Sequence, residues 1–161
     1  MTRKERAEAY FNEGYNCAQS VVMAFADETD VPVGLLRRIS APFGGGMGRL
    51  REVCGAVSGM VMLAGLAQER DMLNRTDKAE LYALERRLAE AFREKTGSIV
   101  CRELLATRPH GDEHNSMKPD CRTLVGLAAE IIEESGIFDR RKEIGVQGGT
   151  DNATADGEKN A

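Results

Sequence analysis

Four cysteines are the residues of this chain best suited to chemistry. They are spread along its 161 residues, as Cys17, Cys54, Cys101 and Cys121. Thiolates bind soft metals and iron–sulfur clusters, and pairs of thiols form disulfides. In a reducing cytosol such a set more often serves metal, cluster or redox chemistry than structural cross-linking. Four unrelated buried thiols are the simpler alternative, and composition alone does not decide between the two.

Each cysteine lies at or close to a predicted helix start: Cys17 after Asn16, Cys121 after Asp120, Cys54 before Gly55, and Cys101 three residues after Ser98. The N–H groups and the macrodipole at a helix N-terminus favour the thiolate and lower the pKa of a thiol. We therefore expect the N-termini of several helices to converge on one site. If they are exposed, Cys17 and Cys121 should have the lowest thiol pKa values, because each is a first helical residue.

A glycine-dense stretch, GGGMG at residues 44–48, precedes Cys54. Glycine is favoured where the backbone needs a positive φ or approaches a neighbour closely. The stretch lacks the Lys-Ser/Thr of a P-loop and follows no predicted strand, so no nucleotide motif fits it. Its N–H groups either cradle an anion or cofactor, with Gly45 and Gly46 as the binding residues, or form a tight turn. Arg49 and Arg51 follow and would add positive charge beside the thiolates.

Gly55 and Gly59 are four residues apart, which places them on one face of a predicted helix. That face carries almost no side chain, so another helix or a cofactor can approach it closely. We assign both glycines to cofactor contact as candidates. Replacing either with valine is predicted to destabilise the fold strongly, because a branched side chain would fill the contact.

The rest of the sequence predicts an all-α, single-domain bundle of about six or seven helices. Aromatic residues make up only 5%, Trp is absent, and no period-two strand pattern or internal repeat is visible. We expect a helical domain over residues 1–144 and a polar, disordered tail over residues 145–161. The predicted helices begin at about Arg3, Cys17, Pro32, Val53, Asp77 (capped by Thr76), Ser98 and Cys121, and end near Phe11, Ala26, Ile39, Arg70, Lys95, Leu105 and Ser135.

Charge and hydropathy limit the classes of function. The formal net charge of −4 gives no electrostatic support for nucleic-acid binding. The longest apolar stretch, about Val53 to Ala67, is shorter than the roughly 20 residues of a membrane helix, and the N-terminus has no apolar signal region. We therefore expect a cytoplasmic protein without membrane insertion. Its redox partner, its oligomeric state and whether it is an enzyme stay open.

The motifs together resemble a known family. GYNCAQ (residues 14–19), GGGMG (44–48) and CGAVSG (54–59), followed by Cys101 and Cys121, resemble the C_GCAxxG_C_C family of small prokaryotic proteins described as redox-active. The resemblance covers roughly Met1 to Gly136. It implies that the four cysteines are the site, as redox-active residues and metal ligands. A similarity to the cluster-binding part of split-Soret cytochromes favours an iron–sulfur cluster, and the c-type haem motif CxxCH is absent.

Three hypotheses remain open at this point. In the first, the four thiolates bind an iron–sulfur cluster or another metal and the protein transfers electrons. In the second, the cysteines form redox-active disulfides, for which Cys101–Cys121 and Cys17–Cys54 is a plausible pairing. In the third, zinc stabilises a non-enzymatic helical module. His110 and His114 lie between Cys101 and Cys121 at a spacing that suits zinc, although a solvated loop pair is the simpler interpretation.

Overall fold

The computed structural model describes residues 1–107 and 120–139. Over these residues the fold is all-α, which confirms the prediction, and seven helices have six or more residues. They are α1 (Arg3–Asn12), α2 (Cys17–Met23), α3 (Val33–Ser40), α5 (Gly55–Leu66), α6 (Arg75–Thr96), α7 (Cys101–Ala106) and α8 (Cys121–Ser135). Three shorter turns complete the described chain: η1 (Ala26–Glu28), η2 (Ala41–Phe43) and α4 (Gly44–Met47). The predicted boundary at residues 144 and 145 and the pair His110 and His114 fall outside these residues.

Three helices begin at the caps that the sequence predicts. The side chains of Thr2 and Asn16 each accept a hydrogen bond from the backbone three residues on, in capping boxes that start α1 and α2. Asp120 accepts from the N–H of Thr123 and caps α8. These caps satisfy N–H groups that a helix leaves without an intrahelical partner. They also fix Cys17 and Cys121 as first helical residues.

Several predicted boundaries are wrong. Helix α2 ends at Met23 and not at Ala26, and α7 begins at Cys101 and not at Ser98. Helix α6 is capped by Asn74, not Thr76, because the Asn74 side chain accepts from the N–H of Asp77 and its backbone is extended. Helix α5 begins at Gly55, so that Cys54 is its N-cap and Val53 lies outside it. It ends at Leu66, before the predicted Arg70.

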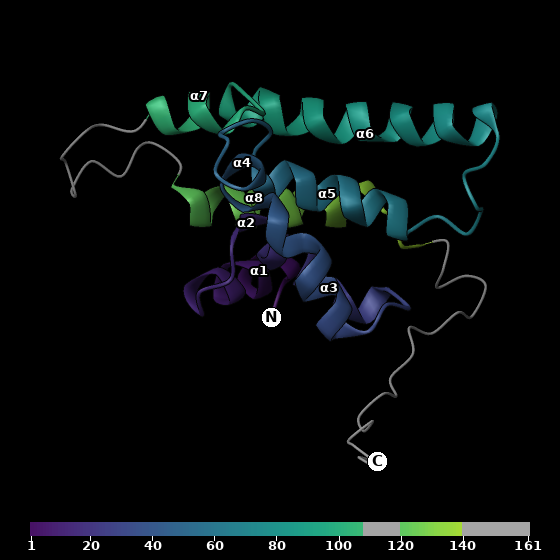
Figure 1. Ribbon diagram of the computed structural model, residues 1–161, viewed down its shortest axis with the longest axis horizontal. Helices are drawn as coiled ribbons and strands as arrows, with labels where there is room; N and C mark the ends of the chain where they lie inside the picture. Colours follow the sequence, from purple (N-terminus) through teal and green to yellow (C-terminus); the bar gives the residue numbers. More distant parts are fainter. Residues whose placement is uncertain (108–119, 140–161) are drawn as a thin grey trace, which may run out of the picture.

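The core lies between three helices, α2, α5 and α8, which occupy the middle of the molecule in Figure 1. Helix α1 packs along α8, and α2 packs along α5. Helix α6 runs across one side and buries only Leu88 and Phe92, while its other core-facing apolar side chains, including Leu81 and Leu84, are only partly buried. In the described residues, no helix has the length and apolar character needed to cross a membrane. The largest fully buried side chains in this core are Val21, Val22, Leu36, Val57, Met60, Leu63, Phe92, Val125 and Ile132.

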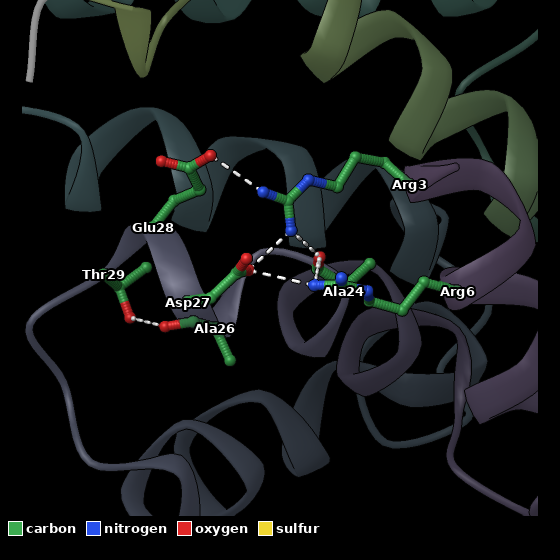
Figure 2. A network of polar contacts seen from close by, with 7 residues as sticks. All are labelled: Arg3, Arg6, Ala24, Ala26, Asp27, Glu28 and Thr29. Carbon is green, nitrogen blue, oxygen red and sulfur yellow. Dashed lines mark hydrogen bonds and ion pairs between the residues drawn. The ribbon is translucent and has the colours of Figure 1, made fainter. Parts of the chain in front are cut away.

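A charged network holds the end of α2 against α1 (Figure 2). The guanidinium of Arg3 donates to Glu28 at 2.7 Å and to the carbonyl oxygen of Ala24 at 2.7 Å, and it also pairs with Asp27. Arg6 donates to the same Asp27 carboxylate at 3.1 Å. The short turn η1 follows α2, and this network fixes it to the first helix of the chain.

Candidate functional site

All four cysteines line one small cavity. Its volume is about 40 Å³, and it lies where the start of α2, α5, α7 and α8 meet. Three of the cysteines are the first residues of their helices and the fourth, Cys54, is an N-cap. All four are free thiols; Cys54 is buried and the other three are half-buried. The remaining lining is mainly apolar and glycine: Gly45, Gly46, Arg51, Gly55, Leu104, Leu105 and Leu124.

A short antiparallel pairing brings Cys54 and Cys101 to the same site. Residues 51–54 run beside residues 99–102, around an isolated bridge between Val53 and Val100. The N–H of Cys54 donates to the carbonyl oxygen of Ile99 at 2.8 Å, and the N–H of Cys101 donates to that of Glu52 at 2.6 Å. Sequence reasoning missed this pairing, because it is too short to produce an alternating hydrophobic pattern.

The glycine-dense stretch forms a loop in the left-handed conformation. A left-handed backbone costs a residue other than glycine roughly 1–2 kcal/mol, and such strain concentrates at functional sites. Hydrogen bonds within the loop offset part of this cost, including those from the N–H of Arg51 to Gly45 and of Glu52 to Gly46. The residues with positive φ, between 59° and 70°, are Gly45, Gly46, Met47, Gly48, Arg49 and Arg51.

Two glycines allow the backbone to approach the cysteines closely. A Cβ at Gly46 would lie 2.6 Å from the Cβ of Cys101, and one at Gly55 would lie 3.0 Å from the Cβ of Cys17. Gly45 also lines the cavity. The fourth glycine assigned to cofactor contact, Gly59, does not line it, because the neighbour on that face is Val21 of α2, 2.8 Å from a Cβ at this position.

The comparison with known proteins identifies the family. Residues 15–135, well over half of the chain, match the family described as "Putative redox-active protein (C_GCAxxG_C_C)". The chain belongs to this family. All four cysteines that line the cavity lie within the matched residues. No curated protein and no solved structure matches the chain.

Two of the four thiols, Cys17 and Cys54, resist ionisation because their pKa values are raised. A hydrogen bond from Cys17 to Cys121 raises the pKa of Cys17 far above its ordinary value, and burial and the three neighbouring cysteines add to the effect. Burial raises the pKa of Cys54 to about 11, although the N–H groups of Ala56 and Val57 donate to its sulfur and oppose the rise. The expectation of a low pKa applies to an exposed thiol, and Cys17 is half-buried, with its pKa raised instead. The convergence of the cysteines is the physical reason, because it gives the Cys17 thiol a hydrogen-bond partner in Cys121 and buries it, while repulsion between thiolates adds a smaller effect.

Arg51 is the one ionisable side chain besides the cysteines among the described residues that line the cavity. Its Nη1 atom lies 3.9 Å from the sulfur of Cys101 and donates to it. The predicted positive charge beside the thiolates therefore comes from Arg51. The side chain of Arg49 instead packs against Gly45. A Cβ added at Gly45 would lie 2.8 Å from the Cγ of Arg49.

No group of three or more His, Cys, Asp or Glu side chains in the described part of the chain is arranged to hold a single metal ion. Four thiolates around one zinc ion, at 2.3 Å each, would have sulfurs only about 3.8 Å apart. In a [4Fe–4S] cluster each of the four cysteines binds a different iron atom, so the ligand sulfurs lie farther apart than around a single zinc ion.

Proposed function

We propose that the four cysteines hold an iron–sulfur cluster and that the protein transfers electrons through it. The observation that supports this function is the meeting of four thiols, from four separate helix starts, around one cavity. Four cysteine thiolates are the usual ligand set of such clusters. Leu104, Leu105 and Leu124 complete a largely apolar wall, which would limit the access of water.

The hydrogen bonds around the cavity also fit a negatively charged group. The sulfur of Cys54 accepts from the N–H groups of Ala56 and Val57, and that of Cys101 accepts from Arg51. Hydrogen bonds to ligand sulfurs stabilise negative charge and help to set the reduction potential. The raised pKa values of Cys17 and Cys54 mean that both are uncharged thiols without iron, so that cluster binding would release their protons. When bound, the cluster supplies one-electron chemistry, while the chain binds it, shields it and donates the hydrogen bonds.

One contact supports a second candidate function, thiol–disulfide exchange. Cys17 and Cys121 hydrogen-bond to each other. Their oxidation would form one disulfide and release two protons and two electrons to a thiol oxidant. This pair differs from the pairs considered from sequence spacing, Cys17 with Cys54 and Cys101 with Cys121. A reducing compartment, for which we propose the cytoplasm, would keep the thiols available for either function.

Anaerobic purification tests the proposal. We expect a coloured protein that contains iron and acid-labile sulfide and that bleaches on reduction. Serine at any one of Cys17, Cys54, Cys101 or Cys121 should lower the iron content, while serine at the remote, exposed Tyr82 of α6 should not. A colourless protein that takes up no iron on reconstitution, and that loses two thiols per chain as a Cys17–Cys121 disulfide, would replace the cluster with the second function. Stoichiometric zinc with redox-inert thiols would refute both.

A further inference from the structure

Three apolar side chains are exposed on the loop that lines the cysteine cavity. Met47, Leu50 and Val53 are 46%, 62% and 41% exposed, respectively. Gly46 and Arg51 of the same loop line the cavity, so the exposed side chains belong to a segment that forms part of the cavity wall. A cluster of exposed apolar residues beside a functional site is typical of an interaction surface.

The loop is held in one conformation. Residues 45–49 and Arg51 have left-handed backbones, and the N–H groups of Arg51 and Glu52 bond back to Gly45 and Gly46. Its end is paired with the start of α7, where the N–H of Arg102 donates to the carbonyl oxygen of Arg51 at 3.2 Å. A surface that is already ordered loses less conformational entropy when a partner binds.

The charge of this loop is opposite to that of the chain as a whole. The formal net charge is −4, yet the loop exposes Arg49 and Arg51. Its one carboxylate, that of Glu52, pairs with Arg102 at 2.5 Å. Two further carboxylates at the starts of α7 and α8 also have local partners: Glu103 accepts from the hydroxyl of Ser98, and Asp120 accepts from the N–H of Thr123.

We propose that residues 47–53 are the docking surface for an acidic electron-transfer protein, whose carboxylates face Arg49 and Arg51 around an apolar centre. Arg51 connects this surface to the site, because its guanidinium contacts the sulfur of Cys101. Complementary charge would steer such a partner to the cysteine site and disfavour basic proteins. The choice of an electron-transfer partner rests on the proposed function, whereas the cationic entrance is a property of the chain itself.

Charged thiol reagents measure that entrance without a cluster. Reduced, metal-free, full-length protein is treated with an anionic (sulfonatoethyl) or a cationic (trimethylammonioethyl) methanethiosulfonate. The Cys101 thiolate attacks the reagent, a mixed disulfide forms, and methanesulfinate leaves. Mass spectrometry of the tryptic peptide 96–102, which contains no other cysteine, gives the rate at Cys101. Because both reagents attack the same thiolate, the ratio of their rates reports the local electrostatic potential and not the pKa.

We expect the ratio of the anionic to the cationic rate to be about tenfold higher than in an unstructured cysteine peptide at low salt. A unit positive charge about 6 Å from the reacting sulfur in water has an effect of that order on this ratio. The preference should fall at high salt. The preference for the anionic reagent should also fall severalfold in Arg51→Gln. It should fall in the same way in Arg49→Gln, although Arg49 does not contact a cysteine. Arg87→Gln removes the same charge from the exposed face of α6 and should leave the ratio unchanged.

Equal rates for the two reagents, a preference for the cation, or a preference that survives both loop substitutions would overturn the proposal. Arg49→Gln keeps the test valid if Arg51→Gln fails to fold. The outcome is separate from that of the cluster experiment, because it uses protein without iron. Protein that never binds iron but shows the anion preference would refute the cluster and leave the acidic docking surface in place.

Discussion

Replacing Gly46 with alanine should destabilise the protein more than any comparable change in the loop. Gly46 has φ +70°, and a Cβ there would lie 2.6 Å from the Cβ of Cys101 and 2.8 Å from the backbone nitrogen of Glu52. The nitrogen belongs to the segment paired with α7, so it cannot move without disturbing that pairing. The added methyl group therefore strains both the loop and the cysteine site.

The magnitude has two parts. The left-handed conformation costs alanine about 1–2 kcal/mol, and overpacking of a close contact typically costs a further 1–3 kcal/mol. We expect Gly46→Ala to lower the free energy of unfolding by roughly 2–5 kcal/mol. Gly48 provides a matched control, because it has φ +59° but its nearest neighbour, the carbonyl oxygen of Pro42, is 4.0 Å from a Cβ. Gly48→Ala should show the conformational part alone, roughly 1–2 kcal/mol.

Urea unfolding of the reduced, metal-free proteins, followed by circular dichroism, measures both free energies. The reasoning requires Gly46→Ala to be the less stable variant by at least about 1 kcal/mol. Equal losses for the two variants would refute it, because they would show that the loop does not pack against Cys101 in solution. A larger loss in Gly48→Ala would do the same.

Three further predictions use the same measurement. Gly59→Val should lower the free energy of unfolding by several kcal/mol, because the new side chain would meet α2. Gly65 lies on the same helix but has no atom within 4 Å of a Cβ, so Gly65→Val should be close to neutral. The pKa of Cys54 rises from an ordinary 9.0 to about 11 in the folded, metal-free protein, so folding favours its neutral thiol. This contribution to the free energy of unfolding is fully present below pH 9, and roughly 2–3 kcal/mol of it is lost between pH 9 and 11. Cys54→Ala should flatten that part of the pH dependence; an unchanged slope would contradict the shift. Arg3→Ala should cost about 1–3 kcal/mol because it removes the hydrogen bonds of a partly buried guanidinium to Ala24, Asp27 and Glu28. Arg122→Ala, which breaks an exposed pair, should cost less than about 1 kcal/mol.

Features of this fold that depend on neighbouring residues could be predicted from the sequence. The capping boxes at Thr2 and Asn16, and the cap at Asp120, each involve side chains and N–H groups within four residues. Their positions therefore predict where α1, α2 and α8 begin. The same local signals placed Cys17 and Cys121 at helix starts, and this placement suggested that the cysteines converge.

Features that depend on distant residues were missed. The pairing of residues 51–54 with residues 99–102 has no sequence pattern of its own, although it sets Cys101 beside Gly46. The left-handed backbones of Met47, Arg49 and Arg51 were also not predicted, because this conformation is normally expected only at glycine. Hydrogen bonds within the loop and to the start of α7 offset part of the cost of these conformations.

The pKa of Cys17 shows how the two levels combine. The start of a helix favours a thiolate, and that argument holds for each cysteine considered alone. Once the fold brings the four sulfurs together, each negative charge raises the cost of the next, and the hydrogen bond from Cys17 to Cys121 favours the protonated thiol. Iron would compensate these charges, and a Cys17–Cys121 disulfide would remove two of them, so both candidate functions relieve the same repulsion. Local structure therefore prepares Cys17 as a ligand or nucleophile, and convergence keeps its thiol protonated until iron or an oxidant takes the place of the proton.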